Sequence, residues 1–377
     1  MSSIVLTSGK TRPSLAEVVP NSLAAMRGEA GSLGLPAVRG VVVMLVDGLG
    51  AQLLRSRAGH ARHLVAGWGS DDSGFSFPST TVAGITQLTT GQPAGAHGLV
   101  AYSVWDRGAD EYRNQLSGWG PGMDPATWQL QPTMFEQVPA PQVQSAVISV
   151  GEYRDSGLTR ASLRGARYLA ADSMLERCEL AAQFCRKQRL PLVYLYHAEL
   201  DQAGHRYGCQ SDQWLEQLEE LDSAFAALLA QLPSDIGVLV VADHGMIDIP
   251  LEAQIDLPQD LLTDVAAVAG EPRLRHLYLV TPGAPAAADL AQRLREVEGE
   301  RAVICTREEA IAAGWYGAQV HPAAAARIGD VIVAATANVT YFSPEMPASQ
   351  RRMIGQHGSI TDAETLVPIV RHGAFRH

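Results

Sequence analysis

Short, uninterrupted apolar runs recur along this chain of 377 residues, and they constrain its fold more than any other feature. In chain order they are Val41 to Val46, Ala146 to Val150, Leu192 to Tyr196, Val238 to Ala242, Leu277 to Val280 and Val331 to Ala335. Continuous rather than alternating hydrophobicity is typical of central strands that are covered on both faces. The runs therefore predict a buried, mostly parallel sheet.

Helix-like segments separate these runs. Asp172 to Lys187 has acidic residues early and basic residues late, and Ser211 to Leu232 repeats its apolar residues at intervals of three and four. This alternation predicts an α/β fold, a three-layer α/β/α sandwich around a central, mostly parallel sheet. We expect a single domain spanning residues 1–377, within which the looser segment 251–326, rich in Ala, Pro and Glu, is interpreted as a lid or insert.

Charge and composition exclude several classes of protein. A net charge of −11 argues against a nucleic-acid polymer as partner, because such binding needs clustered Lys and Arg. Residues 1–10 hold no export signal, and no apolar stretch reaches the roughly 18–20 residues of a membrane span, so we predict a cytoplasmic protein with no membrane partner. The four cysteines lack CxxC spacing and are interpreted as reduced, packed thiols. The oligomeric state stays open.

Metal-binding residue types follow the apolar runs, at or near the point where each run ends. They are Asp47 after the first, Asp201 and His205 after the third, and Asp243 and His244 after the fourth, with His357 further on. Because the carboxyl ends of strands form the ligand crevice of an open α/β sheet, we expect these side chains to converge. Three Asp and three His suit two divalent ions, with imidazole favouring zinc over magnesium.

Two spacings within this set have a structural meaning. Asp201 and His205 lie four residues apart, so on a helix they share one face and can grip one ion. Asp243 and His244 are adjacent and would diverge on regular structure, unless the chain turns sharply at Gly245. Taken singly, each residue has a simpler explanation as a turn, a cap or a chance spacing. Their order and shared position favour a metal site.

Five blocks of sequence then resemble one known family, in that family's order. They are Val-Asp-Gly-Leu-Gly at 46–50, Phe-Pro-Ser-Thr-Thr at 77–81 with Thr-Thr-Gly at 89–91 and Ala-His-Gly at 96–98, Leu-Asp-Gln-Ala-Gly-His at 200–205, Ala-Asp-His-Gly-Met at 242–246 and His-Gly at 357–358. Over about 41–370 the chain resembles the type I phosphodiesterase/nucleotide pyrophosphatase family of the alkaline phosphatase superfamily. The resemblance implies cleavage of phosphodiester or pyrophosphate bonds in small, nucleotide-like substrates.

The resemblance also implies a role for each of the candidate metal ligands and for one threonine. One zinc would be held by Asp201, His205 and His357, and the other by Asp47, Asp243 and His244 together with the nucleophile. The family's nucleophilic threonine stands ten residues before the Gly of its Thr-Gly pair, which is Thr81 here, and would form a phospho-threonine. A helix beginning there would offer free N–H groups to phosphate oxygens. Ser79 or Thr80 could equally serve as its N-cap.

Residues that contact substrate are harder to assign. The resemblance implies a phosphoryl-binding Asn three residues after the nucleophile, where this chain has Gly84. Tyr102 and Trp105 could stack a nucleobase or fill the core, and Arg154 could pair a phosphate or lie at the surface. The densest basic cluster, Arg273, Arg275 and His276, is interpreted as a solvated strand edge.

Other functions compete with this interpretation. A phosphomonoesterase or a phosphonoacetate-type carbon–phosphorus hydrolase is possible on the same scaffold, although no basic group near the blocks offsets the extra charge of a monoester. A sulfatase would need a Cys-x-Pro-x-Arg segment, a phosphoglycerate mutase a Ser nucleophile and a large insertion, and an NTPase a GxxxxGK[ST] motif. A non-catalytic metal-stabilised binding protein is disfavoured because the ligand set is intact and the hydroxyl is retained.

Overall fold

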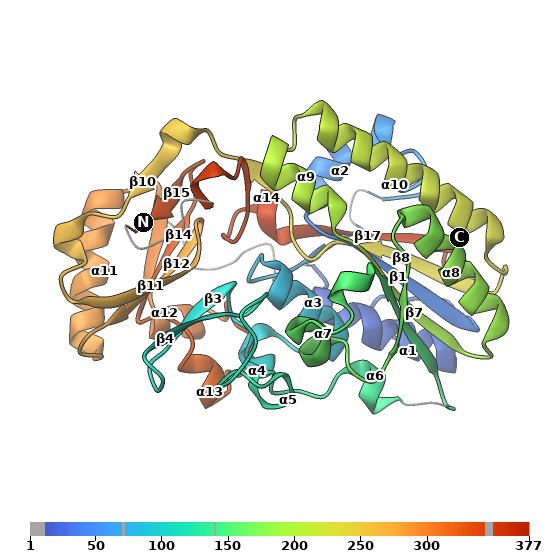
Figure 1. The fold of residues 1–377 in the computed structure, drawn as a ribbon, viewed down its shortest axis with the longest axis horizontal. Helices are drawn as coiled ribbons and strands as arrows, with labels where there is room; N and C mark the ends of the chain where they lie inside the picture. Colours follow the sequence, from blue (N-terminus) through green and yellow to red (C-terminus); the bar gives the residue numbers. More distant parts are fainter. Residues whose placement is uncertain (1–11, 70–71, 139–140, 344–349, 377) are drawn as a thin grey trace.

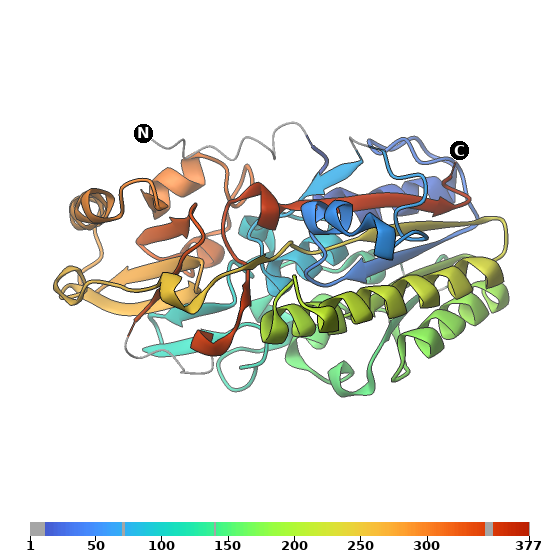
Figure 2. The same cartoon turned by 90° about the horizontal axis from the view of Figure 1, so that it is seen from above.

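The computed structural model describes residues 12–69, 72–138, 141–343 and 350–376, and Figures 1 and 2 show its fold. Residues 1–10, on which the prediction of no export signal rests, lie outside the described residues. Among the residues that are described, no helix is both long and apolar enough to cross a membrane. All four cysteines are buried free thiols, as predicted.

A seven-stranded sheet forms the centre of the larger part of the molecule. In spatial order its strands are β2 (Ser73–Phe75), β17 (Leu366–Gly373), β8 (Ile236–Val241), β1 (Gly40–Val46), β7 (Pro191–His197), β5 (Gln144–Ser149) and β6 (Arg167–Ala170). The strands from β8 to β6 run parallel, whereas β17 runs antiparallel to both β8 and β2. The predicted α/β fold with a mostly parallel sheet is confirmed.

Alternate residues of β1 face two different hydrophobic cores, and this produces the three layers. One core receives the even-numbered residues of Val42–Val46, and the other receives the odd-numbered residues of Val41–Leu45. Helices α8 (Met174–Lys187) and α10 (Asp212–Gln231) cover the first core, and α1 (Val18–Arg27) and α3 (Thr81–Thr90) cover the second. Figure 1 shows α10 and α3 on opposite sides of the sheet. Ser173 and Ser211 cap α8 and α10, close to where the sequence predicts these helices to begin.

A second, four-stranded antiparallel sheet lies at the other end of the molecule, with α11 (Ala284–Glu298) packed on it (Figure 1). Its strands are, in order, β11 (Val265–Glu271), β12 (Leu274–Leu279), β14 (Val331–Ala335) and β13 (Ala302–Thr306). Two of the predicted central strands were therefore assigned to the wrong sheet, because they form β12 and β14. They are continuously apolar since this sheet too is covered on both faces.

The basic cluster at the start of β12 is buried, so its interpretation as a solvated strand edge was wrong. Arg273, Arg275 and His276 are each 0% exposed. Arg273 pairs with Glu364 of α14 (Asp362–Thr365) through two contacts of 2.8 Å, Nε to Oε1 and Nη2 to Oε2. Because α14 leads directly into β17, this pair fastens the β11–β12 hairpin to the larger sheet. The role of segment 251–326 as a lid stays a prediction.

Candidate metal centre

The carboxyl ends of β1, β7 and β8 bring the six candidate ligands into one cluster. Asp47 follows β1, Asp201 and His205 lie on α9 (Glu199–Tyr207) after β7, Asp243 and His244 follow β8, and His357 follows β16 (Gly355–Gln356). Within it, two trios each offer donor atoms that lie within 4.8 Å of one another. One is the implied trio of Asp47, Asp243 and His244; the other joins His244, instead of the implied His205, to Asp201 and His357. His205 is still adjacent, with Nε2 3.3 Å from Asp201 Oδ2.

The first trio is buried: Asp47 is 3% exposed, and Asp243 and His244 are 0% exposed. His244 Nε2 lies 3.2 Å from Asp47 Oδ1 and 3.7 Å from Asp243 Oδ2. Asp243 Oδ1 accepts the N–H groups of Gly48 and His244, while its Oδ2 has no hydrogen-bond partner in the described part of the chain. The chain turns at Gly245, where a Cβ would lie 2.0 Å from the carbonyl oxygen of Ala363. Only glycine fits there, and the turn lets the side chains of Asp243 and His244 both face the site.

The three imidazoles are all oriented in the same way. The Nδ1 atoms of His205, His244 and His357 contact the carbonyl oxygens of Gly355, Gly245 and Ser79 at 2.8, 3.0 and 2.8 Å. A carbonyl only accepts, so each Nδ1 carries a proton, and each Nε2 is turned toward the cluster. Backbone-oriented imidazoles of this kind are typical of metal ligands.

The electrostatics of the cluster call for a cation. Burial, helped by the charge of Asp47, raises the pKa of Asp201 to about 6 and the pKa of Asp243 well above its ordinary value. Burial would lower the pKa of His244, but the carboxylates of Asp243 and Asp47 outweigh it and raise this pKa to about 10. The pKa of His357 is far below its ordinary value because of burial and its positive neighbours. This donor set fits divalent metal ions, which offset buried negative charge.

Thr81 is the one hydroxyl of its segment that reaches the cluster. It is the first residue of α3, and its Oγ1 lies 3.2 Å from His244 Nε2 and 3.5 Å from Asp47 Oδ1. Ser79 instead donates its hydroxyl to the carbonyl oxygen of Ser359. Thr80 occupies the N-cap position, but its side chain makes no capping hydrogen bond. The expected side-chain cap from Ser79 or Thr80 is therefore absent.

Gly84 lies one turn further along α3 and faces protein rather than the cavity. A Cβ at this position would lie 2.5 Å from the Cβ of Asp243 and 2.8 Å from its carbonyl oxygen. The Asn that the resemblance implies could not be accommodated here without moving α3. Gly84 thus brings the helix close to the cluster of candidate ligands, and it is not among the residues that line the cavity beside Thr81.

A cavity of about 680 Å³ opens beside Thr81. Four candidate metal ligands form its floor: Asp47, Asp201, His205 and His357. Its walls are rich in aromatic rings: Tyr102, Trp119, Tyr153, Tyr168, Tyr194 and Tyr196.

Trp105 is not among the lining residues and packs edge-on against Tyr112, with ring centroids 4.8 Å apart. Arg154 is exposed, outside the lining, with its guanidinium over the Tyr168 ring. Of these three predicted substrate contacts, only Tyr102 lies in the wall.

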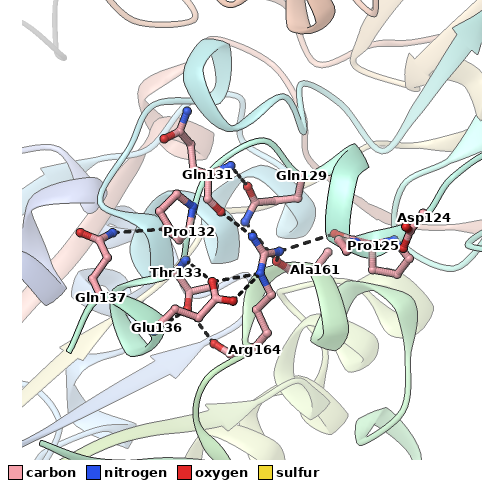
Figure 3. Close-up of polar contacts among 11 residues, drawn as sticks. Asp124, Pro125, Gln129, Gln131, Pro132, Thr133, Glu136, Gln137, Ala161 and Arg164 are labelled. Atoms are coloured by element: carbon pink, nitrogen blue, oxygen red, sulfur yellow. Dashed lines mark hydrogen bonds and ion pairs between the residues drawn. The ribbon is translucent and has the colours of Figure 1, made fainter. Parts of the chain in front are cut away.

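One wall is held in place by the hydrogen bonds around Arg164 (Figure 3). Its Nε lies 2.9 Å from both carboxylate oxygens of Glu136, and its Nη2 donates to the carbonyl oxygen of Gln131. These contacts tie the end of α7 (Gly157–Ser162) to α6 (Met134–Gln137). Most of α7 lines the cavity, so this network sets the shape of the space that a substrate would enter.

Two site residues were missed by sequence reasoning. The hydroxyl of Tyr196 donates to Asp47 Oδ2, and the carboxylate of Glu271 lines the cavity from the second sheet. Tyr196 is hidden in the apolar run of β7, where its presence just before a strand end was the available signal. No local sequence pattern marked Glu271 as a site residue, because its position in the cavity depends on how the two sheets dock.

Comparisons with known proteins bear on the family and the fold. The sequence profile described as type I phosphodiesterase/nucleotide pyrophosphatase matches residues 41–360. Among solved structures, an inactive variant of murine ectonucleotide pyrophosphatase/phosphodiesterase 5 in complex with AMP is 16% identical, with a TM-score of 0.66 over 89% of this chain and 88% of that one. The human protein is 18% identical, with a TM-score of 0.66 over 88% and 87%.

A phosphonoacetate hydrolase from Sinorhizobium meliloti 1021, in complex with phosphonoformate, is equally similar. It is 18% identical, with a TM-score of 0.67 over 89% of this chain and 91% of that one. A comparison with curated proteins gives no match. At such low identities the structural likeness establishes the fold alone.

Proposed function

Because the chain belongs to the type I phosphodiesterase/nucleotide pyrophosphatase family, a family of hydrolases, we propose that it is a metal-dependent phosphohydrolase of small phosphodiesters or pyrophosphates. The observation that carries the proposal is the position of Thr81. Its hydroxyl, at the start of a helix, lies within 3.5 Å of Asp47 and His244 at the floor of a deep cavity. A hydroxyl beside metal-ligand residues is the arrangement that nucleophilic phosphoryl transfer requires.

In the proposed reaction Thr81 Oγ attacks phosphorus, the bond to the leaving group breaks, and a phospho-threonine forms. Water then cleaves the new P–O bond and restores the hydroxyl. The Thr81 hydroxyl is directed at Asp47 Oδ1, 3.5 Å away, a carboxylate oxygen that would accept its proton. The first turn of α3 supplies free N–H groups for the phosphoryl oxygens.

The metal ligands divide between two ions, for which we propose zinc because imidazole supplies half of the donors. Asp47, Asp243 and His244 would hold the ion beside Thr81, and Asp201, His205 and His357 would hold the second. When bound, such ions activate a hydroxyl and offset the charge of the phosphoryl oxygens.

The lining of the cavity supports a diester or pyrophosphate with a flat organic group. Its aromatic walls suit such a group, and the similar proteins bind AMP and phosphonoformate, which are small phosphorylated ligands. Among the described lining residues the one Lys or Arg is Arg160, which is exposed. Monoester and carbon–phosphorus hydrolysis are the alternatives. The cytoplasmic location and the exclusion of nucleic-acid polymers stay predictions.

Metal removal tests the proposal. We expect elemental analysis of the purified protein to find about two zinc or similar ions per chain, and a strong chelator to abolish hydrolysis of a chromogenic diester until metal is restored. Asp243→Asn should lower the bound metal, whereas Asp155→Asn, at the exposed part of the cavity, should leave it unchanged. Full activity in chelator, from protein without bound metal, would show the proposal to be wrong.

A further inference from the structure

Glu271 is a buried carboxylate in the cavity wall to which the proposed mechanism gives no task. It is 4% exposed, and it ends β11 at the tip of the hairpin where the two sheets meet. Its Oε1 accepts the N–H of Tyr102 at 2.6 Å, and the hydroxyl of Thr80 also favours its ionised form. Its Oε2 has no hydrogen-bond partner among the described residues.

The structure holds this carboxylate next to the reaction centre. Thr80 directly precedes the nucleophile, and Gly358 directly follows the metal ligand His357. A Cβ at Gly358 would lie 2.7 Å from the Cβ of Glu271, so the two backbones pack tightly. The Arg273–Glu364 pair fixes the turn that follows Glu271. These contacts hold Glu271 at this point of the cavity wall.

No nearby cation neutralises Glu271 completely. Arg275 is the basic group that lowers its pKa, but within the described residues the two form no ion pair of 4.0 Å or less. Arg275 instead donates to the carbonyl oxygens of Tyr341 and Gly270. Burial raises the pKa of Glu271 to about 7, so the charged carboxylate prevails at alkaline pH.

We propose that Glu271 is a specificity-determining residue: its fixed negative charge disfavours a phosphoryl group with two negative charges and so selects diesters over monoesters. This inference rests on the proposed function. A diester carries one negative charge at phosphorus, and a monoester at alkaline pH carries two. In a partly buried site a like charge several ångströms away is enough to change a rate by about tenfold or more.

The test compares kcat/KM for bis(para-nitrophenyl) phosphate and para-nitrophenyl phosphate at about pH 8.5, in metal-loaded enzyme. Glu271→Gln keeps the shape and the acceptor for Tyr102 but removes the charge. We expect it to raise monoester kcat/KM by about tenfold or more, with the diester value changing less than about threefold. Glu298→Gln is the matched control, since Glu298 is equally buried but lies outside the cavity lining.

The outcomes separate the two claims. If metal-loaded wild-type enzyme hydrolyses neither ester, the proposed function is contradicted. If the diester is hydrolysed but Glu271→Gln leaves the ratio of the two kcat/KM values unchanged, or Glu298→Gln changes it equally, the role of Glu271 is overturned. Thermal unfolding and metal content establish that each variant is folded, and Glu271→Ala replaces Glu271→Gln if the latter is not.

Discussion

The two sheets of this molecule use buried polar residues in opposite ways. In the seven-stranded sheet, Asp47 and Asp243 come just after β1 and β8, and Asp243 Oδ2 has no hydrogen-bond partner among the described residues. In the second sheet, Arg273 is buried as deeply, yet a carboxylate and backbone carbonyls bind its guanidinium. Burial of a charge alone therefore does not identify a site. An unsatisfied polar atom at a strand end is the better indicator.

The largest expected effect is a loss of catalytic rate on substitution of Thr81, beside the seven-stranded sheet, with stability unchanged. Thr81→Ala should lower kcat by at least about 10³-fold, because the nucleophilic oxygen is lost, while fold and bound metal are largely retained. Thr81→Ser keeps the oxygen and should keep measurable activity. Steady-state kinetics, circular dichroism and elemental analysis measure the three properties.

Ser79 and Thr80 provide the controls for Thr81. Ser79→Ala removes a hydrogen bond to the carbonyl oxygen of Ser359 and should cost about 0.5–1.5 kcal/mol of stability with turnover preserved. Thr80→Ala should likewise leave turnover largely intact. If Thr80→Ala abolished activity and Thr81→Ala did not, the assignment of the nucleophile would be wrong by one residue.

The second prediction concerns stability in the second sheet and leaves the ligand set untouched. Arg273→Ala leaves Glu364 buried without its partner and should lower the free energy of unfolding by about 3–5 kcal/mol. Arg293→Ala is the control, because its pair with Asp289 is exposed on α11 and should contribute at most about 1 kcal/mol. Denaturant titration of both variants measures the difference. Equal losses would mean that the buried pair does not fasten the hairpin.

A smaller, pH-dependent effect tests whether the two regions unfold together. Burial lowers the pKa of His276 on β12 and of His372 on β17 to about 4, from an ordinary value of 6.5. Since the folded pKa is the lower one, the stability is complete above about pH 6.5 and is lost as the pH falls toward 4. Each histidine should contribute a loss of about 2 kcal/mol at pH 5.

Variants of these two histidines complete the test. His276→Gln and His372→Gln should flatten the pH dependence of the free energy of unfolding to the same extent, because the Arg273–Glu364 pair joins the regions. Denaturant titrations between about pH 5 and pH 7 give both slopes. Two separate unfolding transitions, each sensitive to one variant, would show that the regions unfold independently.

Local sequence patterns predicted β1, β5, β7 and β8, because burial on both faces leaves continuous apolar runs. A serine N-cap marks the start of both α8 and α10. The same patterns could not tell to which sheet β12 and β14 belong, since strand pairing is non-local. Strand β17 was not predicted, because Pro368, Arg371 and His372 interrupt its apolar run.

The candidate site was predictable where a topological rule applied. Strand ends of a parallel sheet share one edge, so the Asp and His residues after β1, β7 and β8 could be expected to meet. Gly84 shows the opposite case, because the distance between α3 and Asp243 cannot be read from a sequence. Glu271 likewise depends on the docking of two sheets and has no counterpart in any local pattern.

The smallest expected effect is a loss of catalytic efficiency in Tyr196→Phe, which can be compared with a second tyrosine of the same strand, β7. The Tyr196 hydroxyl donates to Asp47 Oδ2, which leaves Oδ1 to face Thr81 and His244. Removing such a bond to a metal ligand commonly lowers metal affinity or activity 10- to 100-fold, so Tyr196→Phe should lower kcat/KM by about tenfold.

Tyr194 is the matched control for Tyr196, since it lies two residues earlier on β7 with its ring stacked at 6.0 Å. Its hydroxyl is buried and makes no hydrogen bond within the described part of the chain, so Tyr194→Phe removes an oxygen without freeing a metal ligand. Activity and bound metal should therefore fall in Tyr196→Phe and stay near wild type in Tyr194→Phe. If both variants lost activity equally while keeping their metal, the two hydroxyls would act on the substrate, and orientation of Asp47 would not be the cause.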